Sequence, residues 1–483
     1  MVTRSTFRRA PATWRYVALA IVATLVLCTA CSRGDDDVAT GTSSTTTEGT
    51  GDTQGQGDEA GPGDFGTLKD VCGPAEGGGE NGESAQGVSA DSIKVGTVSD
   101  PGFPGRPGLN QELFDASNVF VDWCNEAGGI NGRKLELTER DAKLTEYKQR
   151  ITESCAEDFA LVGGGAVFDD TGQQERLSCL LPSIPAYVVS SQARGADLQV
   201  QPLPNALDTL SDAAMVYVGD KFPETTDKVA FITGNVPATV TVDKQLQEAA
   251  DQLGWKVVYQ VQYNAAGETS WTPFAQAMQS NGAEGVVWTG EPENLAKLKE
   301  AMNEIDYKPK WIVTAANHYD QKFIDLAGPA AGDVYMQSAF VPFFEADSNP
   351  PTQQYLDLFE KYLPDGKAEA LLALQSWSAW LLFATAAKEC GADLTRRCLY
   401  DNAAAVTSWT GGGIHAETNP KSNEAPECTT MLAATPDGFV NAEGFETTDG
   451  LYGCDPDYVV HLKGDYGEGT TLESVGKSLD DVE

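Results

Sequence analysis

The sequence predicts an α/β protein made of two doubly wound, parallel-sheet lobes. Three observations support this fold class. Short apolar runs alternate with stretches of helical spacing, which is the pattern of a parallel sheet with crossover helices. This alternation ends near residue 204 and then starts again, so we expect two similar lobes. A chain of 483 residues with 41% hydrophobic residues is also long enough for two ordinary domains.

The first lobe opens with a strand, a helix and a second strand. Residues 93–98 are rich in β-branched side chains, and apolar residues recur at helical spacing over 113–123. Gly128-Gly129 can take the left-handed conformation that ends a helix, and Asn131-Gly132 favours a tight turn. The chain is then expected to form a strand at 134–139.

This opening unit resembles the start of the type I periplasmic-binding-protein fold. The join at residues 128–137, which reads Gly-Gly-Ile-Asn-Gly-Arg-Lys-Leu-Glu-Leu, resembles the branched-chain amino-acid-binding group of ABC-transporter substrate-binding proteins. The resemblance extends over about residues 92–461. It implies an N-terminal lobe of residues 89–206 and 338–420 and a C-terminal lobe of residues 207–337 and 421–470. A three-segment hinge near 204–208, 335–342 and 418–428 would join them.

The remaining elements follow from the same periodicity. In the first lobe we expect helices at 144–159 and around 174–180, and strands at 160–163 and 184–189. In the second lobe we expect helices at 208–222, 239–253, 271–280 and 293–305, and strands at 228–233, 256–262, 285–289 and 310–314. The last part is expected to form a strand near 334–336, helices at 350–363 and 369–389, and a hairpin between 428 and 454 that resembles the one ending this family's chains.

Residues 370–387 carry no charge, so a membrane span has to be weighed against a buried helix. The stretch contains Gln375, Ser376, Ser378 and Thr385, which make it too polar for a comfortable span. A buried helix packed on a sheet is the better interpretation.

The first 31 residues have the layout of a secretory signal peptide. A basic start leads into an apolar stretch at 17–28 and then into Thr29-Ala30-Cys31. Cys31 followed by Ser32 resembles a bacterial lipoprotein processing site, which implies that Cys31 is lipidated. The site departs from the usual pattern in having Cys28 where Leu is common. Plain secretion is the alternative.

Residues 32–88 are acidic and rich in Gly, Ser and Thr, and we expect them to form a disordered tether. Cys72, close to Leu68 and Val71, suggests that the last part of the tether is attached to the globular body. The formal net charge of −38, from 71 acidic and 33 basic residues, argues against a nucleic-acid partner, because phosphate binding needs clusters of Lys and Arg.

Cysteine usage indicates an oxidising compartment. Removing Cys28 with the signal peptide and assigning Cys31 to the lipid leaves eight cysteines, which allow 105 pairings. Sequence proximity and the fold that the resemblance implies favour the pairs Cys155–Cys179, Cys390–Cys398 and Cys428–Cys454. Cys72 and Cys124 are then expected to form the fourth disulfide.

Nothing in the sequence predicts an active site. The three histidines, His318, His415 and His461, are isolated from one another, and the HExxH, GxSxG and P-loop patterns are missing. We therefore expect no enzymatic activity, no cofactor and no metal.

Candidate ligand-binding residues follow from the strand ends, because ligands bind beyond the carboxyl ends of the strands in open parallel sheets. In the first lobe these residues are Asp100, Gly164, Phe168, Asp169, Ser190 and Ser191. In the second lobe they are Asn235, Glu291, Asn317 and Tyr319.

The resemblance implies roles for some of these residues. In the amino-acid-binding relatives, the loops after the third and fourth strands hold the ligand's α-carboxylate, and an acidic residue of the second lobe binds the α-ammonium. Ser190 and Ser191 match the hydroxyls of the fourth-strand loop, and Glu291 is the nearest acid. The third-strand loop carries Phe168 and Asp169 where those relatives have small hydroxyl residues, which weakens the expectation of an ordinary α-amino acid.

These roles have alternatives. Helix capping is an equal interpretation of Glu291, and ordinary packing is an equal interpretation of Phe168 and Tyr319, whose rings are otherwise suited to stacking on an apolar or planar ligand.

The function implied by the resemblance is that of an extracytoplasmic substrate-binding protein, lipid-anchored at the cell membrane. It would capture a small solute such as an amino acid, an amide or an organic acid by hinge closure and deliver it to ABC permease subunits. We expect a monomer. The alternative from another class is an extracellular sensor or partner-binding module with the same clamshell fold.

Overall fold

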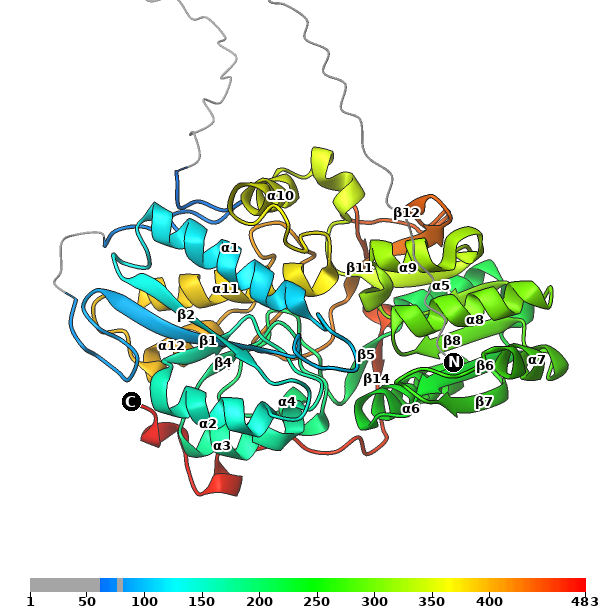
Figure 1. Ribbon diagram of the computed structural model, residues 1–483, viewed down its shortest axis with the longest axis horizontal. Coiled ribbons are helices and arrows are strands. Elements are labelled where there is room, and N and C mark those ends of the chain that lie inside the picture. Colours follow the sequence, from blue (N-terminus) through cyan, green and yellow to red (C-terminus); the bar gives the residue numbers. More distant parts are fainter. Residues whose placement is uncertain (1–60, 76–80) are drawn as a thin grey trace, which may run out of the picture. The chain divides into compact units, whose positions relative to one another are not determined.

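The computed structural model describes residues 61–75 and 81–483, and the backbone of this part alternates between strands and helices as the sequence predicts (Figure 1). Two sheets, each with its own helices, form an N-terminal lobe and a C-terminal lobe within the described residues. A short two-stranded sheet lies between them (Figure 1).

The N-terminal lobe is built on a parallel sheet in the order β2-β1-β3-β4. Its strands are β1 (Ser92–Ser99), β2 (Lys134–Asp141), β3 (Ala160–Val162) and β4 (Ser183–Ile184). Helices α1 (Gln111–Ala127) and α11 (Leu371–Glu389) cover one face, and α2 (Tyr147–Glu157) and α3 (Gln173–Ser178) cover the other (Figure 1). The lobe also contains α4 (Ser191–Arg194), α10 (Pro350–Tyr362) and α12 (Arg396–Ala404).

Helix α11 explains the uncharged stretch at 370–387. Trp377 and Trp380 on this helix are fully buried, and their rings lie 5.2 and 5.3 Å from the ring of Phe120 on α1. The helix is therefore apolar because the lobe packs around it. Among the described residues, no helix is long and apolar enough to cross a membrane.

The C-terminal lobe is built on a mainly parallel sheet in the order β12-β11-β10-β9-β8-β6-β7. The parallel strands are β6 (Val229–Gly234), β7 (Val257–Tyr263), β8 (Gly285–Thr289), β9 (Trp311–Val313) and β10 (Val334–Ser338). The antiparallel edge contains β11 (Cys428–Thr435), β12 (Gly438–Asn441) and β13 (Gly453–Cys454). This edge is the expected late hairpin.

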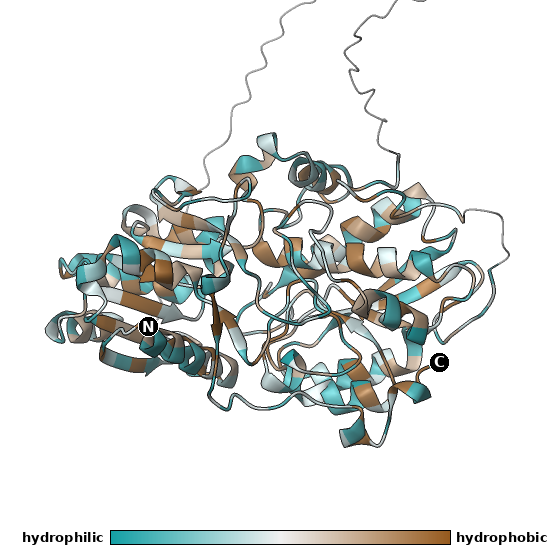
Figure 2. Ribbon diagram, turned by 180° about the vertical axis from the view of Figure 1, so that it is seen from behind, coloured by the Kyte–Doolittle hydropathy of each residue, from teal (hydrophilic) through white to brown (hydrophobic). Residues whose placement is uncertain are grey.

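Helices cover both faces of this second sheet. α5 (Ala213–Lys221) and α6 (Pro237–Gln252) pack on one face. α7 (Thr272–Ser280), α8 (Pro292–Glu304) and α9 (Gln321–Ala327) pack on the other. Hydrophobic residues concentrate on the central strands, while the outer helices alternate between hydrophilic and hydrophobic residues (Figure 2).

Two predicted elements differ from the structure. The strand expected at 184–189 ends after Ile184, because Pro185 has no N–H group to continue the ladder. The helix expected at 208–222 begins only at Ala213; the residues before it form strand β5 (Thr209–Ser211), which pairs antiparallel with β14 (Val459–His461). The paired residues Thr209 and His461 lie 252 positions apart in the sequence, so local periodicity could not reveal this strand.

The chain crosses between the lobes at the three expected places: before β5, after β10 and before β11. It crosses once more after β14. The N–H groups of Lys463 and Gly464 donate to the carboxylate of Glu248 on α6. Further on, Leu472 and Val482 are buried against the N-terminal lobe. The C-terminal segment is thus attached to both lobes.

Residues 61–75 belong to the packed structure, although the sequence places them in the tether. Phe65 is fully buried beside Trp123 and Trp377, with ring centroids 6.1 and 5.3 Å away. A disordered tether over 32–88 is therefore wrong for this part of the segment. The signal peptide and Cys31 lie outside the described residues.

Disulfide bonds join the same pairs that the sequence analysis favours. Within residues 61–75 and 81–483 these are Cys72–Cys124, Cys155–Cys179, Cys390–Cys398 and Cys428–Cys454. The first bond ties the N-terminal segment to α1.

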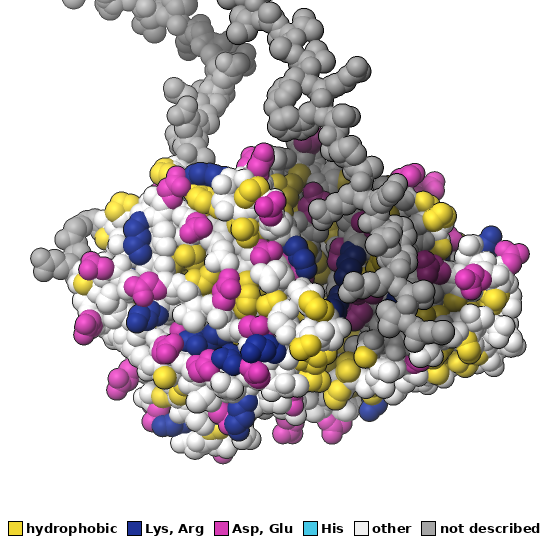
Figure 3. Space-filling model, viewed as in Figure 1, with side chains coloured by type: hydrophobic (Ala, Val, Ile, Leu, Met, Phe, Trp, Pro, Cys, Tyr) yellow, Lys and Arg dark blue, Asp and Glu magenta, His cyan; other side chains and the backbone are white. Residues whose placement is uncertain are grey.

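Acidic and basic side chains are interspersed on the face seen in Figure 3. In the N-terminal lobe, Arg150 of α2 forms ion pairs with Glu146, which precedes the helix, and with Glu153 on the same helix.

Candidate functional site

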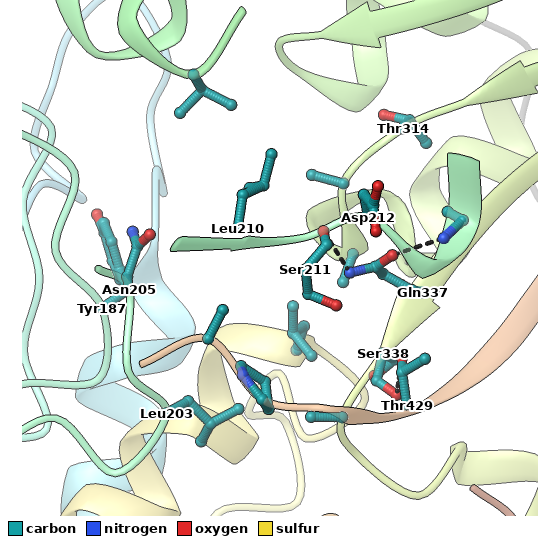
Figure 4. A pocket seen from close by; sticks show the side chains of 18 of the residues that line it. Tyr187, Leu203, Asn205, Leu210, Ser211, Asp212, Thr314, Gln337, Ser338 and Thr429 are labelled. Carbon is teal, nitrogen blue, oxygen red and sulfur yellow. Dashed lines mark hydrogen bonds between the residues drawn. The ribbon is translucent and has the colours of Figure 1, made fainter. Parts of the chain in front are cut away.

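A cavity of about 350 Å³ lies between the two lobes. This volume falls near the lower end of ordinary small-molecule sites, which span roughly 300–1,000 Å³. Figure 4 shows Tyr187, Leu203 and Asn205 of the N-terminal lobe on one side, and Asp212, Thr314, Gln337 and Thr429 of the C-terminal lobe on the other. Most of the remaining lining is apolar and includes Leu246, Val287, Val313, Phe340 and Leu371.

The cavity lies where the sheet topology predicts a ligand site. Thr289, Val313 and Ser338 are the last residues of β8, β9 and β10, and all three line it. The carboxyl ends of these parallel strands meet at one edge of the second sheet. The lobes therefore enclose a space at that edge.

Several buried oxygen atoms in the lining have no hydrogen-bond partner among the described residues. They are both carboxylate oxygens of Asp212, Oγ1 of Thr289 and Oε1 of Gln375. Buried polar groups are nearly always paired, because an unpaired one costs free energy. Asp212 and Thr289 belong to the C-terminal lobe and Gln375 to α11 of the N-terminal lobe, so both walls offer polar contacts to a bound molecule.

Asp212 precedes α5, the position at which an aspartate side chain usually caps a helix. In this structure Gln337 caps it instead. The Oε1 of Gln337 accepts the N–H of Ala214 at 2.7 Å, and its Nε2 donates to the carbonyl of Ser211 at 3.0 Å. Asp212 lines the cavity but is only 2% exposed as a residue, and both of its carboxylate oxygens are buried (Figure 4). Its burial raises its pKa from 3.8 to about 7.

Two acidic residues predicted to contact the ligand hold loops together. The carboxylate of Asp100 accepts the N–H groups of Leu144 at 2.7 Å and Val167 at 2.9 Å. The carboxylate of Asp169 accepts those of Val189 at 2.8 Å and Ser190 at 3.0 Å. Burial raises the pKa of Asp100, and it raises that of Asp169 to about 6.

The other predicted residues of the N-terminal lobe lie around these loops. The hydroxyl of Ser190 accepts the N–H of Ala193 and so caps α4. The hydroxyl of Ser191 donates to Gln192. Gly164 lines a separate space of about 20 Å³ together with Asp169. Phe168 is half-buried at the end of the loop after β3, directly before Asp169.

Three predicted residues of the C-terminal lobe make contacts within loops. Asn235 accepts the N–H of Ala265 through Oδ1. Asn317 donates to the carbonyl of Gly290. Tyr319 accepts the N–H of Phe343 at 2.8 Å, and the two rings stack with centroids 5.5 Å apart.

Glu291 reaches across to the other lobe. Its Oε2 lies 2.5 Å from Nη1 of Arg106, which belongs to the loop after β1. Glu291 makes no side-chain capping bond to α8. Glu291 therefore takes part in an ion pair between the two lobes.

The ten residues predicted from strand ends are not among the described residues that line the 350 Å³ cavity. Residues that precede them in the sequence line it instead: Tyr187 and Val188 before Ser190, Thr289 before Glu291, and Ala316 before Asn317. A ligand role for the ten stays a prediction. His318, one of the three histidines, is fully buried, and its ring is hydrogen-bonded to the hydroxyl of Thr314.

Sequence reasoning missed Asp212, Thr289, Gln337 and Gln375. Thr289 could have been predicted from the sequence, because it is the last residue of a predicted strand. Asp212 fell inside a predicted helix, and Gln375 inside a helix considered for its apolar character. Neither position carried a local signal for a cavity.

Comparisons with known proteins agree with this geometry. The sequence matches the family described as periplasmic binding protein over residues 92–438. A search of curated proteins returns no match.

Similar solved structures are substrate-binding proteins. One is a fatty acid ABC transporter substrate-binding protein from Thermomonospora curvata, with a TM-score of 0.64 and 16% identity over 78% of this chain and 97% of that one. Another is a leucine-binding protein from Thermotoga maritima, with a TM-score of 0.61 and 13% identity over 76% and 99%. A third is a branched-chain amino acid transporter substrate-binding protein from Streptococcus pneumoniae in complex with isoleucine, with a TM-score of 0.60 and 17% identity over 73% and 100%.

Two α/β lobes with a cavity between them define a binding protein of the type I periplasmic fold. The chain belongs to the periplasmic-binding-protein family. Members of this family act outside the cytoplasm and are binding proteins rather than enzymes.

Proposed function

We propose that this chain is the solute-binding component of an ABC importer and captures a small, largely apolar solute between its two lobes. The observation that carries the proposal is the cavity itself. Residues of both lobes line it, and lining residues of both lobes carry buried oxygen atoms that have no hydrogen-bond partner among the described residues. A molecule held there would contact both lobes and so favour their closed arrangement.

The membrane anchor is part of the same proposal. A lipid on Cys31 would hold the protein at the extracytoplasmic face of the membrane. Permease subunits in that membrane would receive the solute.

Closure would depend on contacts that cross between the lobes. Arg106 makes such contacts with Glu291 and Glu293, at 2.5 and 2.8 Å. The crossing segments would act as the hinge, and the ion pair would form only when the lobes approach each other.

A thermal-shift screen of the full chain tests the proposal. The panel should contain amino acids, amides, amines, alcohols, fatty acids and aromatic acids. A solute present at about 100 times its Kd should stabilise the protein by roughly 2.7 kcal/mol. Ser211→Trp, which fills the cavity, should abolish the shift. Ser280→Trp, at the exposed end of α7, should keep it.

An uptake measurement in cells distinguishes an import function from a sensing function. Cells that lack the chain should lose uptake of the solute found in the screen, and expression of the wild-type chain should restore it. Binding without any effect on uptake would support the sensor instead. A shift that survives Ser211→Trp would contradict the cavity as the site.

A further inference from the structure

The chemistry of the cavity points to one class of solute. Asp212 is the one carboxylate among the described lining residues, which include no Lys, Arg, His or Glu. An ionised group buried without a counter-charge is unfavourable unless a bound molecule pairs with it. The solute that pairs with Asp212 must therefore carry hydrogen-bond donors or a positive charge.

The other unpaired atoms agree with a donor. Oε1 of Gln375 is an acceptor, and the hydroxyl of Thr289 can accept as well. Together with the two oxygens of Asp212, they offer acceptors to a bound head group. An ammonium group has three donors and no acceptor, which suits such a set.

The cavity offers few favourable contacts to a ligand carboxylate. The described lining has no cation to pair with it. The N–H groups of Val189 and Ser190, at the end of the loop after β4, already bind the carboxylate of Asp169. A ligand carboxylate would have to displace Asp169 to use them.

The position of Asp212 also has no structural explanation of its own. A carboxylate at the start of a helix normally caps it, but Gln337 makes that contact with Ala214. Ser211 and Thr314 lie on the same side of the cavity as Asp212 (Figure 4).

We propose that the solute is an amine with an apolar body and no carboxylate, and that its protonated amine binds the carboxylate of Asp212. The inference rests on the proposed function, since it assigns a solute class to the same cavity. The apolar body would pack on side chains such as Leu246, Val287 and Phe340.

Three probes with one apolar body test it: cyclohexylmethylamine, cyclohexylmethanol and cyclohexylacetate. Calorimetric titration of the full chain should show the amine binding at least tenfold more tightly than the alcohol, and the carboxylate most weakly. Asp212→Asn should weaken the amine at least tenfold and change the alcohol by less than threefold. Asp208→Asn is the matched control, because Asp208 is exposed, lies four residues earlier and carries the same charge.

A second variant controls for the possibility that Asp212→Asn misfolds. Asp212→Ser keeps a residue that caps helices well and should give the same loss for the amine. A thermal unfolding temperature of either variant at or above that of the wild type shows that the fold is intact.

The outcomes separate this inference from the proposed function. Tightest binding of the carboxylate, or equal amine affinity in Asp212→Asn and the wild type, overturns the amine. A hit of another class in the broad screen, with none of these three probes binding, also overturns it and leaves the cavity as the site. Amine binding that survives Ser211→Trp contradicts the proposed function itself.

Discussion

Arg106 and Glu291 form an ion pair between the two lobes, with Nη1 of Arg106 2.5 Å from Oε2 of Glu291. Nη2 of the same guanidinium lies 2.8 Å from Oε1 of Glu293, which also binds Lys322 at 2.7 Å. The two glutamates raise the pKa of Arg106, although burial opposes them. The loop after β1 and the start of α8 are therefore connected electrostatically.

Arg106→Gln should shift the lobes toward a more open arrangement. The side chain is about one-third exposed, so we expect a loss of about 1 kcal/mol and solute affinity that is roughly fivefold weaker. Small-angle scattering of the unliganded protein should give a larger radius of gyration. Arg150→Gln removes the ion pairs with Glu146 and Glu153, both within the N-terminal lobe, and serves as the control. Equal scattering and affinity in the two variants would contradict the interlobe role.

Asp212→Asn should stabilise the unliganded protein at alkaline pH. Burial raises the pKa of Asp212 to about 7, so the folded state holds a proton that the unfolded chain has released. The stability this carboxyl contributes is present below pH 4 and is lost as the pH rises through 7. The variant should match the wild type near pH 4 and unfold several degrees higher at pH 8. A pH-independent difference between the two thermal unfolding temperatures would argue against a buried, unpaired carboxylate.

His415 should make the protein sensitive to acid. Its ring nitrogens lie 2.9 Å from the hydroxyl of Ser378 and 2.7 Å from the carbonyl of Ala416, and burial lowers its pKa to about 4. The stability it contributes is present above pH 6.5 and is lost as the pH falls toward 4. His415→Gln should flatten the decline of unfolding free energy over this range, whereas exposed His461→Gln should not. Identical slopes for both variants would refute the assignment.

The Cys72–Cys124 disulfide should contribute more stability than Cys390–Cys398. The two bonds close loops of 52 and 8 residues, and chain entropy favours the longer by roughly 1.5 kcal/mol. Calorimetry of the two double Cys→Ser variants should show the larger loss for the first pair. The opposite order would contradict the chain-entropy account of the two bonds.

Elements with strong periodicity were predictable from the sequence. Strand β1 and helix α1 lie where residues 93–98 and 113–123 indicate, and α11 is the buried helix expected from its uncharged sequence. In each case neighbouring residues determine both the element and the face that packs. The family resemblance supplied the arrangement of the two lobes, which local patterns alone do not give.

Contacts between distant residues were not predictable. Strand β5 forms because β14 pairs with it, and Phe65 is buried because Trp377 lies beside it. Glu291 meets Arg106 from the other lobe. The ligand site also depends on a contact between distant residues. Gln337 makes the capping contact with Ala214, which leaves Asp212 without that role. A side chain's partners depend on the fold, so strand ends identified the edge of the sheet but not the residues that line the cavity.

Hydrogen exchange of the full chain, with and without the solute found in the screen, tests the central claim most directly. Binding between the lobes predicts slower exchange at residues 186–188 of the N-terminal lobe and at residues 209–215 and 313–316 of the C-terminal lobe, all of which include cavity-lining positions. Helix α7 should exchange equally in both states. Protection confined to one lobe would contradict a solute held between the lobes.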